Sequence, residues 1–204
     1  MLSKKNSYHH GNLRSELIHA AIELLDEQGI EAVSVRKIAR KVGVAHSAPA
    51  NHFKDKKALF TALATEIFTH LLSIIDKELK TQANTLSESI HLFSKTILEF
   101  GLKYPNRYHL LWRKECLNNE DEVLYAVMEN MYERLTKILA EHQQQSASLI
   151  KSQASVESQA IALWSMIHGY VTLRLDGNLI AKNDEQSGLE RQTAIIDVLL
   201  NGLM

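Results

Sequence analysis

The sequence predicts an all-α protein. Only two of its 204 residues are prolines and eight are glycines, so few positions force a helix to stop. Leu, Ala, Glu, Lys, Gln and Ile are abundant, and all six are strong or tolerable helix formers. Hydrophobic residues make up 45% of the chain, which supplies ample apolar surface for one large domain or two small ones.

Cysteine content and hydropathy set further limits. The single cysteine, Cys116, excludes a disulfide framework and a multi-thiolate zinc site, and it fits a reducing compartment. No apolar run approaches the roughly 18 residues that a membrane span needs, and no hydrophobic segment follows the first few residues. We therefore expect a soluble, cytoplasmic protein that makes no contact with a membrane.

Charge is divided unevenly along the chain. The net charge of −1 hides a basic beginning: residues 1–60 hold ten Lys or Arg against six Asp or Glu, and the remainder holds 13 against 18. A basic amino-terminal portion on an acidic body is typical of a small phosphate-binding module attached to a part with another task. Surface charge also fluctuates by a few units in any window of this length. Charge alone therefore does not distinguish a phosphate-binding module from ordinary variation, and the sequence motifs have to do so.

Residues 12–28 are predicted to form an amphipathic helix. Its apolar side chains recur with the period of an α-helix at Leu13, Leu17, Ala20, Ala21, Leu24 and Leu25. Asn12 is a competent N-cap, and Gly29 is placed to close the carboxyl end, where a left-handed residue is most easily accommodated.

Two short helices joined by a tight turn are expected next. The first begins after an N-cap at Ser34 and is basic, with Val35, Ile38 and Ala39 inward and Arg36, Lys37, Arg40 and Lys41 outward. Gly43 is free to adopt a positive φ in the turn, and the second helix covers residues 45–52. An N-cap at Asp55 then opens a long amphipathic helix over residues 56–79. Together these segments predict a helix-turn-helix unit.

Beyond residue 80 the pattern continues as a series of helices. They are expected over residues 86–103, 106–117, 121–145, 155–176 and 187–203. Pro105 and the Asn118-Asn119 pair mark breaks, and the polar stretch 143–155 is expected to be a loop or a frayed helix end. No repeat at the period of a solenoid is visible, which argues against an α-solenoid.

The amino-terminal residues follow the pattern of a known family. The stretches that carry the pattern are Tyr8-His9-His10-Gly11-Asn12-Leu13-Arg14, Ala20-Ala21, Gly29, Ser34-Val35-Arg36-Lys37-Ile38-Ala39, Gly43-Val44, His52-Phe53, Lys56 and Leu59. This run of residue types at fixed spacing, over residues 8–63, resembles the amino-terminal domain of TetR-family transcriptional regulators. The resemblance implies an operator-binding head of three helices.

A second match lies in the carboxy-terminal half. Trp164, His168 and Gly169 are similar to residues of the ligand-binding and dimerisation domain in one branch of the TetR family. The resemblance implies an all-α homodimer. Residues 1–56 would form a helix-turn-helix DNA-binding domain, and residues 57–204 a helical ligand-binding and dimerisation domain whose pocket controls the spacing of the two heads.

The family match assigns residues 45–52 to the recognition helix, whose exposed side chains enter the major groove. Three of them donate and accept hydrogen bonds and are candidates for base edges: His46, Ser47 and Asn51. Phosphate contacts, which position the head without reading sequence, are expected from Ser34, Arg36, His52, Lys56 and Lys57. An arm with Lys4-Lys5 and His9-His10 either reaches along the DNA or is a disordered tail.

The recognition segment departs from the family in one respect. Where a Leu-Tyr pair is common, this chain has Pro49-Ala50, so the tyrosine's usual phosphate contact is missing. Proline is tolerable near the start of a helix and breaks a longer one. We expect a short recognition helix with a fixed bend near its end.

The middle helices offer side chains for a ligand pocket, although aromatic and Met residues at helical spacing are first of all core. The predicted pocket residues are Phe93, Phe100, Tyr108, Trp112, Met128, Tyr132, Trp164 and His168. His168 has two competing roles. A lone histidine on an apolar face is more often a hydrogen-bonded core residue, and the alternative is a ligand contact.

The last two helices carry apolar area that a monomer would struggle to cover. Packed against their symmetry mates, they would form a four-helix dimer interface. The predicted interface residues are Trp164, Val171, Leu175, Ile195, Leu199 and Leu203. A dimer of this kind places two recognition helices about 34–36 Å apart and binds a palindromic operator.

Together these features predict a ligand-responsive transcriptional regulator, a repressor released from double-stranded DNA by a small-molecule effector. The alternative is a DNA-binding adaptor or nucleoid-type protein whose body binds a protein partner and no effector. An enzyme is not expected, because there is no nucleophile elbow, no Gly-rich phosphate loop and no base partner for Cys116. The ten histidines lack the spacing of a zinc site, so neither a metal nor a cofactor is expected.

Overall fold

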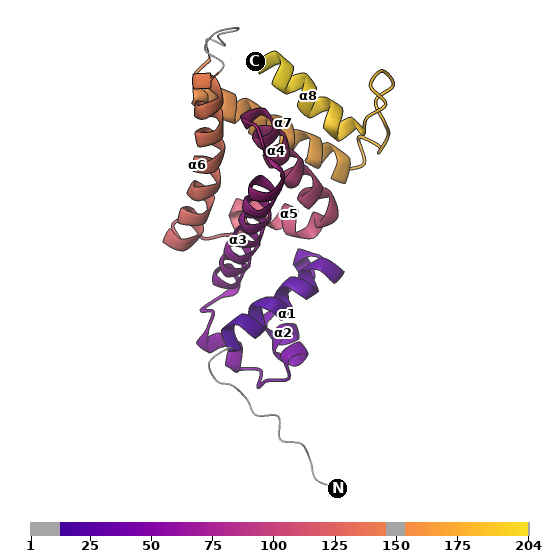
Figure 1. Cartoon of the computed structure of the whole chain (residues 1–204). Coiled ribbons are helices and arrows are strands. Elements are labelled where there is room, and N and C mark those ends of the chain that lie inside the picture. The colour runs from indigo at the N-terminus through magenta and orange to yellow at the C-terminus, as the bar shows by residue number, and fades with distance from the viewer. Residues whose placement is uncertain (1–12, 146–153, 204) are drawn as a thin grey trace.

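The computed structural model describes residues 13–145 and 154–203, with every side chain except those at positions 145 and 199–203. This part of the chain contains no strand, only an isolated antiparallel bridge between Asn183 and Glu190. Its α-helices and short 3₁₀ helices (η) are α1 (Leu13–Gln28), η1 (Ile30–Ala32), α2 (Val35–Val42), η2 (Ala48–Asn51), α3 (Lys56–Gln82), α4 (Leu86–Lys103), α5 (Pro105–Trp112), η3 (Lys114–Cys116), α6 (Glu122–Gln145), α7 (Val156–Leu175) and α8 (Arg191–Leu203) (Figure 1). The predicted all-α fold class is confirmed.

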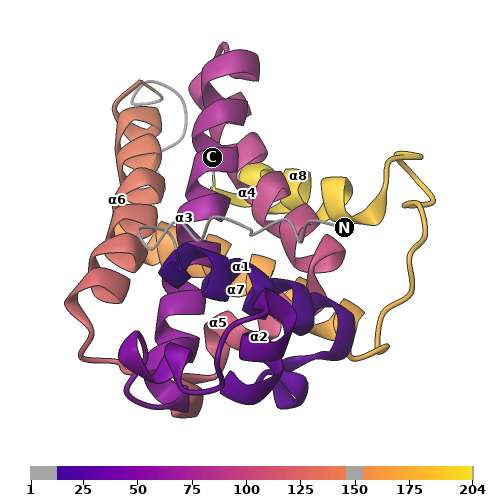
Figure 2. The same ribbon diagram turned by 90° about the horizontal axis from the view of Figure 1, so that it is seen from below.

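The molecule has a small head and a larger helical body. The head contains α1 and α2 at one end, and α3 runs from that end into the body, where it packs against α4 and α6 (Figure 1). α7 packs against both α4 and α6, and α8 lies against α4. Seen from below, α6 and α8 flank the body on opposite sides (Figure 2). The short helix α5 contacts α1, α3 and α4, so it lies where the head meets the body.

Helix ends in the head follow the predicted caps. Ser34 and Asp55 each accept a hydrogen bond from the backbone N–H three residues further on, at 3.4 and 2.7 Å. Gly43 ends α2 in the left-handed conformation, with φ 78° and ψ 28°, and Gly29 after α1 also has a φ of 78°. Each of these signals depends on only a few neighbouring residues, which is why the sequence pattern located them.

The predicted recognition helix is wrong in type. Residues 45–52 form a turn followed by η2, and their backbone bonds join residues three apart, from Ala48 N to Ala45 O at 2.9 Å and from His52 N to Pro49 O at 3.0 Å. Pro49 has no N–H to offer an α-helix, and it disfavours the α conformation in the residue before it. The proline is buried, and the segment takes one turn of the tighter helix.

Other boundaries differ by a few residues. α3 continues to Gln82, and the predicted helix 106–117 is divided at Arg113 into α5 and η3. α8 begins four residues later than predicted, because the Asp184 carboxylate accepts bonds from the backbone of Gln186 and Ser187, at 3.2 and 2.8 Å, in a turn before it. Asn12, the arm at Lys4-Lys5 and His9-His10, and much of the predicted 143–155 loop lie outside the described residues.

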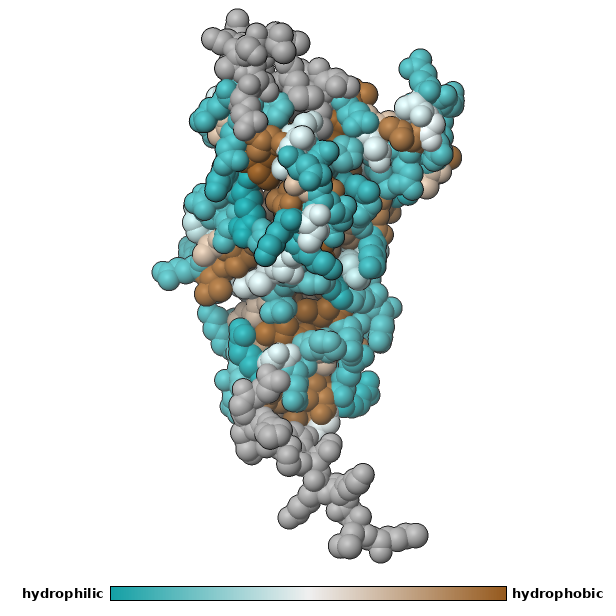
Figure 3. Space-filling view, in the orientation of Figure 1, coloured by the Kyte–Doolittle hydropathy of each residue, from teal (hydrophilic) through white to brown (hydrophobic). Residues whose placement is uncertain are grey.

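One cluster of buried apolar side chains joins the head to the body, whereas the face of the molecule seen in Figure 3 is mostly hydrophilic with a few separate hydrophobic areas. α3 is its main axis, with Leu59, Leu63, Ile67, Leu71 and Ile75 all at most 2% exposed. By length and composition this helix alone, among the described residues, is apolar enough to cross a membrane, with a window of mean hydropathy 1.7. However, 56% of that window is buried inside the structure, as in the core helix of a globular protein.

The crossing of α4 and α7 depends on Gly101. A Cβ atom at this position would lie 2.6 Å from Val171 Cγ1 and 3.0 Å from Tyr108 Cδ2. Val171 is fully buried, so it has little room to move aside. Any side chain at position 101 would therefore push the two helices apart.

We expect Gly101→Ala to destabilise the protein by about 1–3 kcal/mol because it overpacks this crossing. The better helix propensity of alanine, about 1 kcal/mol, offsets only part of that cost. Chemical denaturation measures the change. Because the clash is with the methyl groups of Val171, the double variant Gly101→Ala with Val171→Ala should cost less than the two single variants added together. Strict additivity would show that the two side chains do not meet.

Candidate nucleic-acid interface and effector pocket

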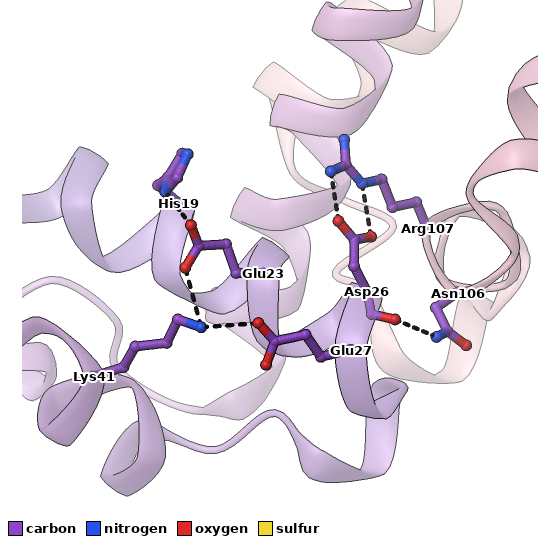
Figure 4. A network of polar contacts seen from close by, with 7 residues as sticks. All are labelled: His19, Glu23, Asp26, Glu27, Lys41, Asn106 and Arg107. Atoms are coloured by element: carbon purple, nitrogen blue, oxygen red, sulfur yellow. Dashed lines mark hydrogen bonds and ion pairs between the residues drawn. The ribbon is translucent and has the colours of Figure 1, made fainter.

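The head carries cationic side chains in two groups. Lys41 belongs to the first and faces α1, where its Nζ lies 3.0 Å from a Glu23 carboxylate oxygen and 3.3 Å from one of Glu27 (Figure 4). The hydrogen bond to Glu23 raises the pKa of Lys41 above its usual value. The second group, from α2 to the first turn of α3, is exposed and makes no ion pair with a carboxylate of the described residues: Arg36, Arg40, Lys54, Lys56 and Lys57. This second group is the positive charge available to a phosphate backbone.

The segment between α2 and α3 presents the residues predicted to read bases. His46, Ser47 and Asn51 are exposed, whereas Pro49 and Phe53 beside them are buried. The guanidinium of Arg14 lies 5.6 Å from the centre of the Phe53 ring, which ties the end of the segment to α1. Buried anchors under exposed polar tips hold the segment in one conformation.

The residues predicted to contact phosphates lie along the same part of the head. Arg36, His52, Lys56 and Lys57 are exposed, and Ser34 is half-buried because its hydroxyl caps α2. All eight predicted residues therefore lie between the start of α2 and the start of α3, and DNA contact at each of them stays a prediction. Arg40 and Lys54 were absent from that set, although both are charged residues beside predicted cap or turn positions.

An ion pair joins the head to the body. Arg107 on α5 donates from Nε and Nη2 to the two carboxylate oxygens of Asp26 on α1, at 2.8 and 2.6 Å, and Asn106 Nδ2 donates to the Asp26 backbone oxygen at 3.2 Å (Figure 4). The Arg107 guanidinium also stacks over the Tyr104 ring at 4.4 Å. Asp26 raises the pKa of Arg107 above its usual value. We call the contact between Asp26 and Arg107 the α1–α5 latch.

An apolar pocket opens between α6 and α7. Its volume is about 230 Å³, and it is lined by Phe68, Trp112, Met128, Met131, Tyr132, Ile161, Trp164 and Ser165. Phe68 and Met131 are buried, whereas Met128, Tyr132 and Ile161 are 38%, 38% and 54% exposed and form its mouth. A larger cleft of about 520 Å³ beside α1 and the start of α6 is lined by charged side chains of both signs. The smaller of these two cavities is therefore the one with an apolar lining.

Trp112 separates the apolar pocket from a cleft of about 330 Å³ under the head, which is lined by Ile30, Asn106, Tyr108, His109, Trp112, Arg113, His168 and Thr172. Tyr108 Oη lies 2.9 Å from His168 Nδ1, and the His168 ring lies 4.9 Å from that of Trp112. Burial lowers the pKa of His168 and raises that of Tyr108, so both are neutral at pH 7. Among residues 13–145 and 154–203, no three His, Cys, Asp or Glu side chains gather to hold a metal ion.

The predicted pocket residues divide into three sets. Trp112, Met128, Tyr132 and Trp164 line the apolar pocket, and Tyr108 and His168 line the neighbouring cleft. Phe93 and Phe100 line neither: both belong to the core, at 0% and 3% exposure, and Phe100 borders a separate cleft between α3 and α4. Met131, another side chain that the middle helices offer, also lines the apolar pocket, whereas sequence analysis missed Phe68, Ile161 and Ser165. Helical periodicity marks apolar faces without saying which face leaves a gap, so it carries no signal for these three.

The predicted dimer residues are also only partly at the surface. The prediction is wrong for Val171, which is fully buried against Gly101 and is not available to a partner. Trp164, Leu175 and Ile195 are half-buried, and the side chains of Leu199 and Leu203 lie outside the described residues. The outward face of α7 instead presents Ala162, Ser165, Gly169 and Leu173, and a Cβ at Gly169 would meet no atom of the described structure within 4 Å.

Comparison with known proteins gives two family matches. Residues 17–63 match the family of bacterial regulatory proteins, tetR family, and residues 90–196, more than half of the chain, match the tetracyclin repressor-like, C-terminal domain. A curated relative is the nucleoid occlusion factor SlmA of Haemophilus influenzae, 30% identical over 123 residues, which are 60% of this chain and 56% of the relative. The match thus spans little more than half of that protein.

Solved structures share the fold. A Rhodococcus protein of unknown function superimposes with a TM-score of 0.81 at 24% identity, covering 98% of this chain and 99% of that one. The transcriptional regulator FadR from Bacillus subtilis, in complex with stearoyl-CoA, superimposes with a TM-score of 0.67 at 21% identity, covering 93% of this chain and 96% of that one. At these identities the likeness shows the architecture alone.

The latch should be measurable as a coupling between two substitutions. We expect Asp26→Asn and Arg107→Gln to show a coupling energy of about 0.5–1 kcal/mol in a double-mutant cycle, because the pair is bidentate and only partly exposed. Denaturant unfolding of the four proteins gives the value. The matched control is a second double-mutant cycle with Glu23→Gln and Lys41→Gln, because this ion pair lies within the head and does not join the head to the body. A coupling energy of zero for Asp26 and Arg107 would show that the contact does not hold α1 to α5.

Proposed function

Because the chain belongs to the TetR family of bacterial regulatory proteins, we propose that it is a repressor that binds a palindromic operator as a homodimer and releases it when a small-molecule effector binds. As a member of this family it is a DNA-binding regulator and not an enzyme. The observation that carries the effector part of the proposal is the position of α5. One short helix holds Arg107 in the latch to the head and Trp112 in the wall of the apolar pocket.

We assign residues 1–56 to the DNA-binding domain and residues 57–204 to the ligand-binding and dimerisation domain. The boundary lies in the first turn of α3, and the amino-terminal family match continues to residue 63. α3 thus begins in the head and ends in the body. Cytoplasmic location, with association to the nucleoid when bound to DNA, belongs to the same proposal.

In the head, η2 and the turn before it would read the operator. His46, Ser47 and Asn51 are exposed and offer donors and acceptors to base edges. Ser34, Arg36, His52, Lys56 and Lys57 would position the head on phosphates, together with the exposed side chains of Arg40 and Lys54. A 3₁₀ turn is shorter than a recognition α-helix, so we expect a short base-specific half-site.

The dimer would form through the outward face of α7 together with α8. Ala162, Ser165, Gly169 and Leu173 lie three or four residues apart and share one face of the helix. A glycine in the middle of a helix costs roughly 0.5–1 kcal/mol relative to alanine, and no described atom of the chain approaches Gly169 closely enough to require it. Close approach of a second copy of α7 explains the glycine.

Release requires that the effector bind the form with displaced heads more tightly than the DNA-binding form. An effector in the apolar pocket would press on Trp112, which lies five residues after Arg107 on the same helix. At 1.5 Å per residue, roughly 7–8 Å of helix separates the two. A helix this short moves as one piece, so displacement of Trp112 would strain the latch and shift α1.

A second candidate function is a DNA-binding adaptor or nucleoid-type protein whose body binds a protein partner. It is supported by the match to a relative named as a nucleoid occlusion factor. The two candidates differ in what the body should contain. An apolar pocket of about 230 Å³ favours the effector-controlled regulator, since a body that serves only as a scaffold has no need of one.

Selection of bound sequences from a random DNA pool tests the proposal. We expect a palindrome preferred over its scrambled version by roughly a thousandfold at physiological salt. Lys56→Ala should weaken binding to both sequences alike and reduce the salt slope by about 1, because it removes one phosphate contact. Asn51→Ala and His46→Ala should instead relax base preference at the positions they contact.

Weak binding that is indifferent to sequence would favour the nucleoid-type protein. If Lys56→Ala and Asn51→Ala changed affinity and base preference in the same way, the division into phosphate-contacting and base-reading residues would be wrong.

The dimer face has its own test. Gly169→Leu should convert the dimer to a monomer at micromolar concentration, because the new side chain projects between the two α7 helices. Analytical ultracentrifugation measures the mass in solution. Ala126→Leu, at an exposed position of α6, is the matched control and should remain dimeric. A Gly169→Leu protein that stays dimeric would place the interface elsewhere.

A further inference from the structure

We infer that the apolar pocket between α6 and α7 takes a small, electrically neutral aromatic molecule with a single ring and a short substituent. The inference rests on the proposed function in treating this pocket as the effector site. It goes further by naming the chemical class of the effector. Charge, ring geometry and volume of the pocket support it independently.

The lining carries no charge. None of the eight residues is Lys, Arg, His, Asp or Glu, and the polar groups among them are the Ser165 and Tyr132 hydroxyls and the two indole N–H groups. An ion without a counter-ion in an apolar site pays a desolvation cost that far exceeds that of a neutral molecule. The pocket therefore selects against carboxylates. For an ammonium ion, cation–π attraction to the four aromatic rings of the lining offsets part of the desolvation cost.

The walls favour a flat ring. The Trp112 ring stands nearly perpendicular to Phe68, at 88° with centres 6.1 Å apart, and at 69° to Trp164 with centres 5.4 Å apart. Aromatic rings prefer such edge-to-face contacts to random packing, and another ring in the pocket continues the pattern. Met128 and Met131 supply flexible, polarizable side chains that adapt to the ring's edge.

Volume sets the size. An apolar cavity of about 150 Å³ in another protein holds benzene, so a pocket of about 230 Å³ holds one ring and a few further atoms. The buried floor of Phe68 and Met131 receives the ring. Tyr132 and Ser165 lie at the exposed mouth, where a hydroxyl or carbonyl substituent keeps contact with water.

Both tryptophans of the chain line this pocket, so intrinsic fluorescence reports on it directly. We would titrate the full-length protein, without DNA, with benzyl alcohol, benzylammonium, benzoate and cyclohexylmethanol. Benzyl alcohol should bind saturably, at least tenfold more tightly than benzoate, more tightly than benzylammonium, and several-fold more tightly than its saturated counterpart. Equal or tighter binding of benzoate or benzylammonium would overturn the inference, as would equal binding of cyclohexylmethanol.

A charge placed at the mouth separates this pocket from other binding surfaces. Met128→Glu should weaken benzyl alcohol and tighten benzylammonium at least several-fold, since a counter-ion is now present. Tyr125→Glu is the matched control: position 125 lies on the same helix, is 62% exposed and does not line the pocket. If the two variants behaved alike, the probes would bind elsewhere.

A second copy of the chain is the rival occupant, because Ser165 lies both at the pocket mouth and on the outward face of α7. Were a partner side chain to fill the pocket, tryptophan emission would change with protein concentration and benzyl alcohol would bind only the Gly169→Leu protein. That result overturns the inference. Operator release is a separate readout: tight binding of benzyl alcohol without any effect on DNA affinity would refute effector control and leave the ligand class standing.

Discussion

The contact between Asp26 and Arg107 is the polar constraint on how the head is oriented on the body, to which the apolar core along α3 joins it. α1 and α2 contact few helices of the rest of the molecule. Apart from α3, the helix that holds them in place is α5. A bidentate ion pair fixes direction as well as distance, because both carboxylate oxygens and two guanidinium nitrogens must align. The orientation of the cationic surface of the head therefore follows the orientation of an eight-residue helix.

That same helix is also part of the aromatic centre of the body. Tyr108 packs beside Gly101 and is hydrogen-bonded to His168, and Trp112 meets the rings of Phe68 and Trp164. Because Gly101 lets α4 and α7 approach closely, Tyr108 and Val171 fill the space between them without a gap. The apolar pocket lies one turn further along α5, at Trp112, and the cleft under the head is lined by both Tyr108 and Trp112. α5 is therefore tightly packed where Tyr108 meets Gly101 and is bordered by open volume beside Trp112.

Local signals in the sequence were sufficient for the helices and their caps, because Ser34, Gly43 and Asp55 act on residues three or four positions away. They failed where a single residue changes the type of helix, as Pro49 does in the recognition segment. They also failed where the answer depends on distant residues. Asp26 and Arg107, for example, are 81 positions apart in the sequence. The burial of Val171 and Phe93 likewise depends on which other helices pack against their own. Periodicity finds an apolar face, and only the tertiary packing shows whether that face meets a core, a cavity or a partner.

The proline in η2 has a thermodynamic consequence for any molecule that the head binds. The pyrrolidine ring restricts φ in the unfolded chain as well as in the folded one, so ordering this segment loses less backbone entropy than an ordinary sequence would. The neighbouring Phe53 anchor and the 3₁₀ bonds confine the rest of the turn before a ligand arrives. The exposed tips at His46, Ser47 and Asn51 thus stand on a pre-ordered backbone, and little of the association free energy is consumed in arranging it.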